Sequence, residues 1–266
     1  MALYDIMVKG RVAVFVILIY ILVISAYYIY RAIQGKTVWL KRIYGIDAIE
    51  EAVARSVELG RPCHFGMGYG GYGLASSKGS AHIAAVSLVD YVSKLTAKYK
   101  TDLVVSYCWP EFYPVLHDTL AENYLAEGRS LTEGEITSLL RYFPTRGFGI
   151  GAMGTIEALK PGANFIFGWV WGEAMLMGEA AAYVGAMQVA SSADYNYGIC
   201  WVLAFSDYAL FPEELFVAGA YCSRDNLQQA SIRGADFAKF LLLASAVISL
   251  ILGLMGNSIW LDLLNT

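Results

Sequence analysis

PCHFGMGYGGYG, residues 62–73, is the stretch that decides the fold of this chain. Its first half predicts a short buried strand, and its second half is a glycine-rich loop. The next segment, 79–99, places alanines and leucines at helical spacing along one face and ends on lysines, where cations favour the helix dipole. A strand, a glycine loop and a helix in this order make the first half of a βαβ unit.

The alternation of strands and helices continues through the middle of the chain. Further strands are predicted at 102–108 (DLVVSYC), 164–170 (NFIFGWV), 187–191 (MQVAS) and 199–205 (ICWVLAF). Helices are expected at 46–59, from Pro110 to about 126, and at 133–142, 148–159, 172–186 and 212–221. This pattern predicts the α/β class, with a Rossmann-like, doubly wound parallel sheet that has helices on both faces.

Two uncharged apolar segments flank this region, at 12–30 and 240–256. A helix rises about 1.5 Å per residue and the hydrocarbon core of a bilayer is about 30 Å thick, so the first segment can span it and the second nearly so. We predict transmembrane helices at 12–31 and 239–261, an N-terminal tail at 1–11, and an α/β domain at 43–238. The competing interpretations are a cleaved signal peptide for the first segment and a buried soluble helix for the second.

Basic residues gather on the inner side of both apolar segments. They are Arg31, Lys36, Lys41 and Arg42 after the first segment, and Arg224, Arg233 and Lys239 before the second. Trp39 and Trp260 lie just outside the segments, where aromatic rings favour the membrane interface. The positive-inside rule therefore predicts a two-pass protein of the cell membrane, with the central domain cytoplasmic and both termini outside.

Composition and cysteine spacing exclude several classes of function. The formal net charge of the 266 residues is −4 and there is no basic run, which argues against nucleic acid as a partner. The four cysteines form no CxxC pair, so we expect small buried hydrophobes and not zinc, iron–sulfur or haem ligands. His64 adjoins Cys63 on a strand, so the two side chains point to opposite faces. We predict no metal site and no cofactor.

The glycine loop is the first candidate site. Residues 66–71 and 68–73 both match GxGxxG directly after the first strand of the domain, where a dinucleotide-binding loop would lie. However, 74–78 separate the loop from its helix, and no acid ends the next strand to hold a ribose. The alternatives are a loop for a nucleotide-like or other anionic ligand, and a tight packed turn. The candidate ligand residues are Gly66, Gly68, Gly70, Gly71, Gly73, Ser76, Ser77 and Lys78.

Two acids in an apolar helix, Glu173 and Glu179 in GEAMLMGEAAAYVG, are the second candidate. Six residues apart, they lie about 120° from alignment on a helix, so they do not form one paired site. One of them would point into the cleft at the carboxyl end of a strand, where open α/β sheets bind ligands. Alternatively, each caps a neighbouring helix or pairs with an arginine such as Arg146 or Arg224.

Three blocks of this sequence resemble a known family. RPCHFGMGYGG, NFIFGWVWGEAMLMGEAAAYVGA and FPEELFVAGAYCSRD are similar, in that order, to blocks of an uncharacterised prokaryotic membrane-protein family catalogued as a domain of unknown function. The resemblance covers roughly 46–255. It implies a Rossmann-like domain tied to membrane helices, and it carries no established activity or functional residue.

Two functions of different classes fit these features. The first is a membrane-anchored structural or interaction protein without catalysis of its own, whose cytoplasmic domain assembles into a homo-oligomer or a larger membrane complex. Its partners would be the bilayer, further copies of the chain and other subunits of the complex. Apolar, aromatic and glycine-rich stretches such as FGIGAMG (148–154) and ADYNYG (193–198) favour it. The alternative is an enzyme or sensor that binds a nucleotide-like or anionic ligand at 66–78.

Overall fold

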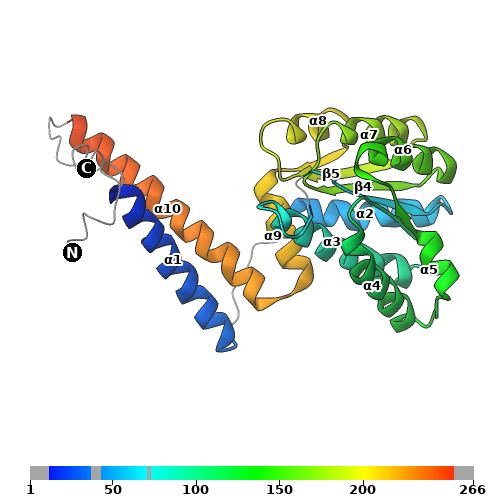
Figure 1. Cartoon of the computed structure of the whole chain (residues 1–266), viewed down its shortest axis with the longest axis horizontal. Helices are drawn as coiled ribbons and strands as arrows, with labels where there is room; N and C mark the ends of the chain where they lie inside the picture. Colours follow the sequence, from blue (N-terminus) through cyan, green and yellow to red (C-terminus); the bar gives the residue numbers. More distant parts are fainter. Residues whose placement is uncertain (1–11, 37–42, 71–72, 255–266) are drawn as a thin grey trace. The chain divides into compact units, whose positions relative to one another are not determined.

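The computed structural model describes residues 12–36, 43–70 and 73–254. The chain divides into two compact units (Figure 1). One consists of Met1–Leu40 together with Asp225–Thr266, and the other is Lys41–Arg224. The predicted tail at 1–11, the two interfacial tryptophans Trp39 and Trp260, and Gly71 of the glycine loop lie outside the described residues.

The smaller unit is a pair of helices, α1 (Val12–Ile33) and α10 (Asn226–Leu254). They lie side by side, and a Cβ at Gly234 would come within 3.3 Å of the Cα of Ser25. Within the described ranges one helix, Asn226–Ile251, is long and apolar enough to cross a membrane by length and composition, and the apolar part of α1, Ile17–Ile33, is shorter. Two membrane spans therefore remain a prediction, and α10 begins well before the residue 239 that we expected.

The larger unit is built on a six-stranded sheet in the order β3-β2-β1-β4-β5-β6, and every pair of adjacent strands is parallel. The central strands are β1 (Cys63–Met67), β2 (Leu103–Tyr107), β4 (Ala163–Gly168) and β5 (Met187–Ser192), and every residue in them is buried. The edge strands are β3 (Leu140–Tyr142) and β6 (Tyr208–Leu210). Strand order reverses between β1 and β4, which confirms the α/β class and the Rossmann-like parallel sheet.

Helices cover both faces of this sheet (Figure 1). One layer contains α2 (Tyr44–Glu58), α3 (Gly79–Lys98), α4 (Tyr113–Ala126) and α9 (Pro212–Ser223). The opposite layer contains α6 (Phe148–Leu159), α7 (Glu173–Tyr183) and α8 (Gly198–Phe205). The short helix α5 (Glu133–Leu139) leads into β3, and the 3₁₀ turns η2 (Pro110–Phe112) and η3 (Thr145–Gly147) complete the connections. Each layer has its own apolar core against the sheet.

The structure corrects three sequence-based predictions. Residues 199–205 form helix α8 and not a strand, because a short apolar run has the same composition in either element. The last strand is instead β6, and the helix expected at 133–142 ends at Leu139 before β3. Cys63, Cys108 and Cys222 are buried as expected, but Cys200 is exposed on α8.

Candidate functional site

The glycine loop and Glu173 both lie at the point where the strand order reverses. Helix α3 follows β1 onto one face of the sheet, and α7 follows β4 onto the other. In open α/β sheets, ligands bind in the crevice that this divergence opens at the carboxyl ends of the strands. The glycine loop after β1 and Glu173 after β4 are therefore neighbours in space, although about a hundred residues separate them along the chain.

Three consecutive backbone N–H groups in the described part of the glycine loop are hydrogen-bonded to the protein. Gly68 donates to the carbonyl of Phe167 (3.2 Å), Tyr69 to Oε1 of Glu173 (3.3 Å), and Gly70 to the carbonyl of Trp169 (2.9 Å). A loop that binds pyrophosphate keeps such groups available for the ligand. The geometry therefore favours the packed turn over the ligand loop.

The glycines are needed because two loops approach each other closely. A Cβ at Gly68 would lie 2.2 Å from the carbonyl oxygen of Trp169, and one at Gly70 would lie 2.1 Å from Cδ1 of the same tryptophan. The indole ring is covered in turn by Lys78, whose Nζ lies 3.7 Å from the ring centroid. Trp169 thus occupies the space beside the loop, and Lys78 is stacked on it in a cation–π contact.

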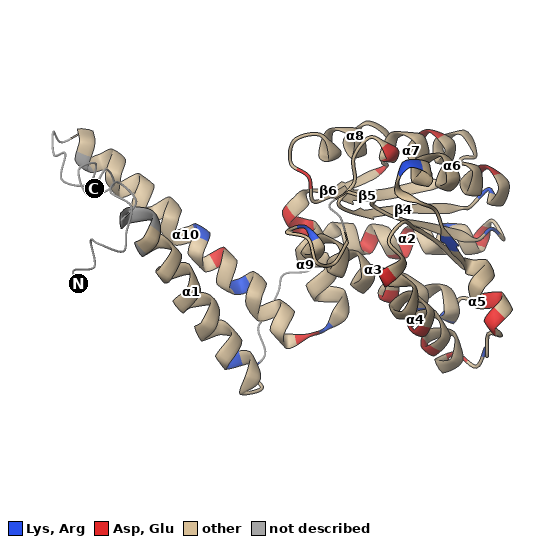
Figure 2. Cartoon of the chain, viewed as in Figure 1, with Lys and Arg blue, Asp and Glu red and all other residues tan. Residues whose placement is uncertain are grey.

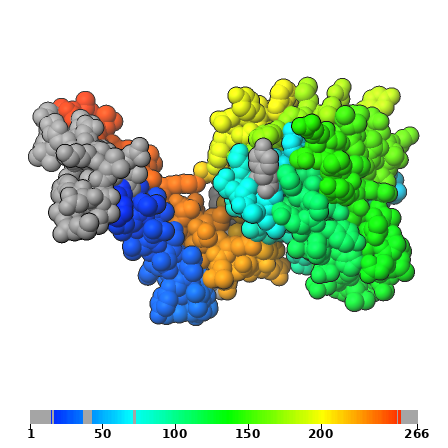
Figure 3. Space-filling view, in the orientation of Figure 1, coloured from blue at the N-terminus to red at the C-terminus, as the bar shows by residue number. Residues whose placement is uncertain are grey.

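The rest of the loop is held by local hydrogen bonds. Ser76 Oγ donates to the carbonyl of Gly73 (2.8 Å) and accepts the N–H of Lys78 (3.2 Å). Glu111 accepts the N–H of Leu74, and Ser77 is exposed. In the space-filling view, the cyan segment that follows β1 forms surface between the green and yellow segments (Figure 3). The predicted loop residues among those described therefore come together as a folded turn.

Glu173 occupies the first position of α7 and is only 5 % exposed. Its Oε1 holds the N–H of Tyr69, whereas Oε2 has no hydrogen-bond partner within the described ranges. Burial raises the pKa of this carboxyl to about 7, against the opposing effect of the backbone N–H groups that bond to it. Glu179, in contrast, is exposed on the same helix. No ion pair joins Glu173 to Arg146 or Arg224 in the described part of the chain.

A cavity of about 300 Å³ opens beside Glu173. Its walls come from the β1 loop, from η3 and from the first turns of α6 and α7. The lining residues are Tyr69, Thr145, Arg146, Gly149, Ile150, Gly172, Glu173 and Leu176. The Tyr69 ring stands edge-on to Trp171, with their centroids 5.9 Å apart. The cavity therefore combines a guanidinium, a buried carboxyl and apolar walls.

The sequence profile of a family described as a domain of unknown function, DUF6754, matches residues 2–264. The chain belongs to this family. The match agrees with the resemblance noted for the three sequence blocks. No curated protein and no solved structure matches the chain. The arguments about function in this member of DUF6754 therefore rest on its own geometry.

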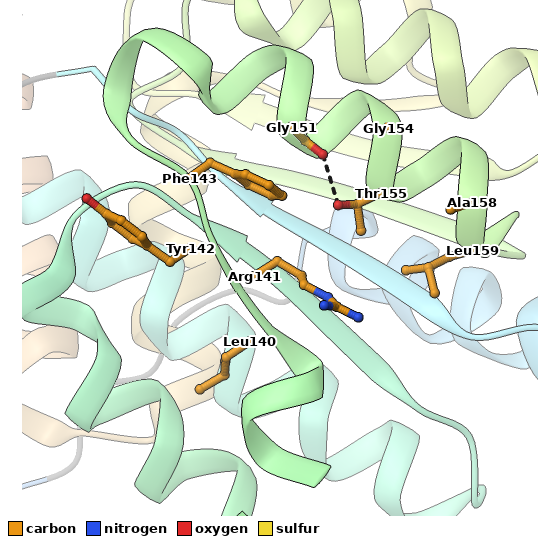
Figure 4. A pocket seen from close by; sticks show the side chains of 9 residues that line it. All are labelled: Leu140, Arg141, Tyr142, Phe143, Gly151, Gly154, Thr155, Ala158 and Leu159. Carbon is orange, nitrogen blue, oxygen red and sulfur yellow. Dashed lines mark hydrogen bonds between the residues drawn. The ribbon is translucent and has the colours of Figure 1, made fainter. Parts of the chain in front are cut away.

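A second, larger cavity of about 480 Å³ lies between the edge strand β3 and α6 (Figure 4). The Phe143 ring covers Gly151, where a Cβ would come within 2.3 Å of it, and Thr155 Oγ1 donates to the Gly151 carbonyl (2.9 Å). Figure 4 shows Arg141 extending toward the part of α6 that carries Thr155 and Leu159. None of its lining residues carries a buried unpartnered polar atom, so the smaller cavity is the better candidate site.

A row of hydrogen-bonded, buried polar side chains crosses the sheet from β2 to β5. His64 on β1 bonds to Asn164 on β4 (2.7 Å) and to Ser106 on β2 (2.9 Å), and Asn164 donates to Gln188 on β5 (3.3 Å). Burial lowers the pKa of His64 to about 4, so the imidazole is neutral at physiological pH. The described residues contain no group of three metal-ligating side chains. The row is best explained as part of the folded core.

Proposed function

We propose that this protein is a membrane-anchored structural or interaction protein whose α/β domain assembles copies of the chain into a homo-oligomer, alone or within a larger membrane complex. It has no catalysis of its own. The anchoring part of the proposal rests on the apolar helix pair of the smaller unit. The proposal includes two membrane spans and a cytoplasmic central domain, as the flanking charges predict.

One observation carries the assembly part of the proposal, and it concerns α8. This helix, GICWVLAF, contains no charged residue, yet Trp201 is 38 % exposed and Leu203 is 53 % exposed. The preceding loop adds the exposed rings of Tyr195 and Tyr197. We call these four residues the α8 surface. Figure 2 shows α8 without a charged residue, whereas α2, α4 and α5 carry charged residues.

Such a surface is typical of a protein interface. Aromatic residues are enriched in interface cores and charged residues are depleted there. A second copy of the chain presents the same uncharged surface, so two copies can bury it against each other about a twofold axis. The N–H groups of Gly68, Tyr69 and Gly70 already have protein acceptors, which favours assembly over the alternative of a nucleotide-like ligand at 66–78.

The test is the mass of the full-length chain extracted from membranes in mild detergent. One chain has a mass of 29.1 kDa, and the proposal expects a multiple of it. Leu203→Lys should shift the population toward single chains. Ile83→Lys is the matched control, because Ile83 is 48 % exposed on the opposite layer and should leave the mass unchanged.

Cys200 gives a second readout in the intact membrane. It is the one cysteine of the four that is exposed, and it lies on α8. A short bifunctional maleimide should therefore link two copies through Cys200, and Cys200→Ser should abolish the linked species. A chain that runs at 29.1 kDa in detergent and gives no Cys200-dependent link would overturn the proposal.

A further inference from the structure

The cavity beside Glu173 has features that neither the fold nor the α8 surface requires. A buried carboxyl oxygen without a hydrogen-bond partner is costly, because it has lost water and gained nothing in return. Glu173 Oε2 is such an atom, and the residue lines an open cavity. Arg146 lines the same cavity, is exposed, and forms no ion pair in the described part of the chain. A ligand can satisfy both groups at once.

We propose that this cavity binds a small soluble anion that also carries an amine, with Arg146 holding the anionic group and Glu173 Oε2 accepting a hydrogen bond from the ammonium. Amino acids and aminoalkyl phosphates share this chemistry. The inference goes beyond the assembly function and is independent of it, since no residue of the α8 surface lines the cavity.

The anionic end follows from the positive groups at the cavity. Two helices, α6 and α7, begin there, and the N-terminus of a helix favours negative charge. Their N-cap positions are Gly147 and Gly172, so no N-cap side chain accepts the N–H groups of the first turns. The guanidinium of Arg146 adds a full charge and paired donors that suit a carboxylate or a phosphate.

The amine follows from the state of Glu173. Its Oε1 already receives the N–H of Tyr69, so the carboxyl is oriented as an acceptor with one oxygen left over. An ammonium supplies both a donor and the positive charge that a buried carboxylate lacks, whereas a hydroxyl supplies the donor alone. An amine should therefore be preferred over a hydroxyl at this end of the ligand.

The size of the ligand follows from the size of the cavity. At about 300 Å³ it lies at the lower limit for small-molecule sites, which excludes a dinucleotide. Gly149 lets α6 pack closely against α7 at the cavity wall, because a Cβ there would lie 3.0 Å from Leu176 Cδ1 and 3.1 Å from the Cβ of Glu173. Ile150 and Leu176 provide apolar wall beside the two charged groups.

Calorimetric titration of the full-length chain in detergent tests the proposal with four probes. Ethanolamine phosphate and β-alanine carry the amine with a phosphate or a carboxylate, and binding of either one supports the proposal and identifies the anionic group. 2-Hydroxyethyl phosphate replaces the amine by a hydroxyl, and inorganic phosphate lacks both. The two probes without an amine should bind at least about tenfold more weakly, as expected for the loss of one charge-assisted hydrogen bond.

Variants of the two charged residues locate the binding. Glu173→Gln keeps the shape and the acceptor for Tyr69, and Arg146→Gln alters an exposed side chain, so both should fold. Each should weaken binding of the amine-bearing probe by about tenfold or more. Glu179→Gln, exposed on the same helix, should leave binding unchanged. The proposal is overturned if no amine-bearing probe binds, if 2-hydroxyethyl phosphate binds equally well, or if Glu173→Gln and Arg146→Gln bind as the parent does.

Discussion

The glycine loop and the Glu173 cavity lie at the same reversal of strand order, yet they differ in how their polar groups are satisfied. The N–H groups of Gly68, Tyr69 and Gly70 all reach protein acceptors, and the glycines pack against Trp169. Beside the cavity, Glu173 Oε2 is buried without a hydrogen-bond partner, and Arg146 is exposed and forms no ion pair in the described ranges. The sequence motif thus marks the position of the crevice, whereas the unsatisfied groups beside it are the basis of the proposed ligand site.

The largest expected effect tests whether the loop is packed. Gly68→Ala places a Cβ 2.2 Å from a backbone oxygen that cannot move aside easily, so the free energy of unfolding should fall by about 3 kcal/mol. Urea denaturation of the chain in detergent measures this. Gly154→Ala is the control, because no atom lies within 4 Å of a Cβ there and alanine favours the helix. Equal stability of Gly68→Ala and the parent would show that the loop is loose enough to admit a ligand.

The next effect concerns how the free energy of unfolding depends on pH. Near neutral pH, we expect the Glu173 carboxyl beside the cavity to make the main contribution. The pKa of Glu173 rises from its ordinary 4.5 to about 7 on folding, so the folded state binds this proton more tightly than the unfolded state does. The resulting stability is present below 4.5 and is lost as the pH rises through about 7. At pH 8, Glu173→Gln should therefore be more stable than the parent by about 2 kcal/mol, and near pH 4.5 the difference should shrink.

Unfolding curves recorded from pH 5 to pH 8 give this comparison directly. The other titratable groups near Glu173 do not interfere, because burial raises the pKa of both Tyr69 and Cys108 and they stay protonated in this range. Parallel pH profiles for Glu173→Gln and the parent would contradict the buried, unpartnered carboxyl.

The smallest effect distinguishes the two roles considered for Lys78. Stacked on Trp169, the lysine should contribute about 0.5–1 kcal/mol to stability through its cation–π contact. Lys78→Gln should therefore lower the unfolding free energy by that amount and leave binding of ethanolamine phosphate unaltered. Weaker binding by Lys78→Gln would indicate that the ligand contacts Lys78 beside the glycine loop. The two regions would then form one site.

The sequence predicted the parts of the fold whose signal is local. The segments 102–108, 164–170 and 187–191 are strands because apolar runs of that length between turns suit the buried centre of a parallel sheet. The edge strands β3 and β6 have three residues each and leave almost no pattern. The apolar run at 199–205 was assigned to a strand for the same reason, since its composition does not distinguish α8 from a buried strand.

The site was predicted only in part, because its decisive contacts join distant segments. Glu173 and Glu179 were both candidate cleft acids, and the sequence did not distinguish which of them would reach the crevice. Nothing in the sequence near the glycine loop indicates that Trp169 fills the space beside it, about a hundred residues later. Arg146 was considered only as a partner for one of the two acids. Its place in the cavity depends on η3, which follows the unpredicted strand β3.

The buried polar row through Ser106, His64, Asn164 and Gln188 has a consequence for how the chain finds its fold. Strands that are apolar on both faces can pair with neighbours in several registers at similar energy. Here a slip of one residue between β1 and β4 would separate His64 Nδ1 from Asn164 Oδ1 and leave these two buried atoms without their hydrogen bond. A shifted register therefore costs more free energy in this sheet than it would in a sheet with an all-apolar interior. The row thus favours one alignment of the four strands during folding.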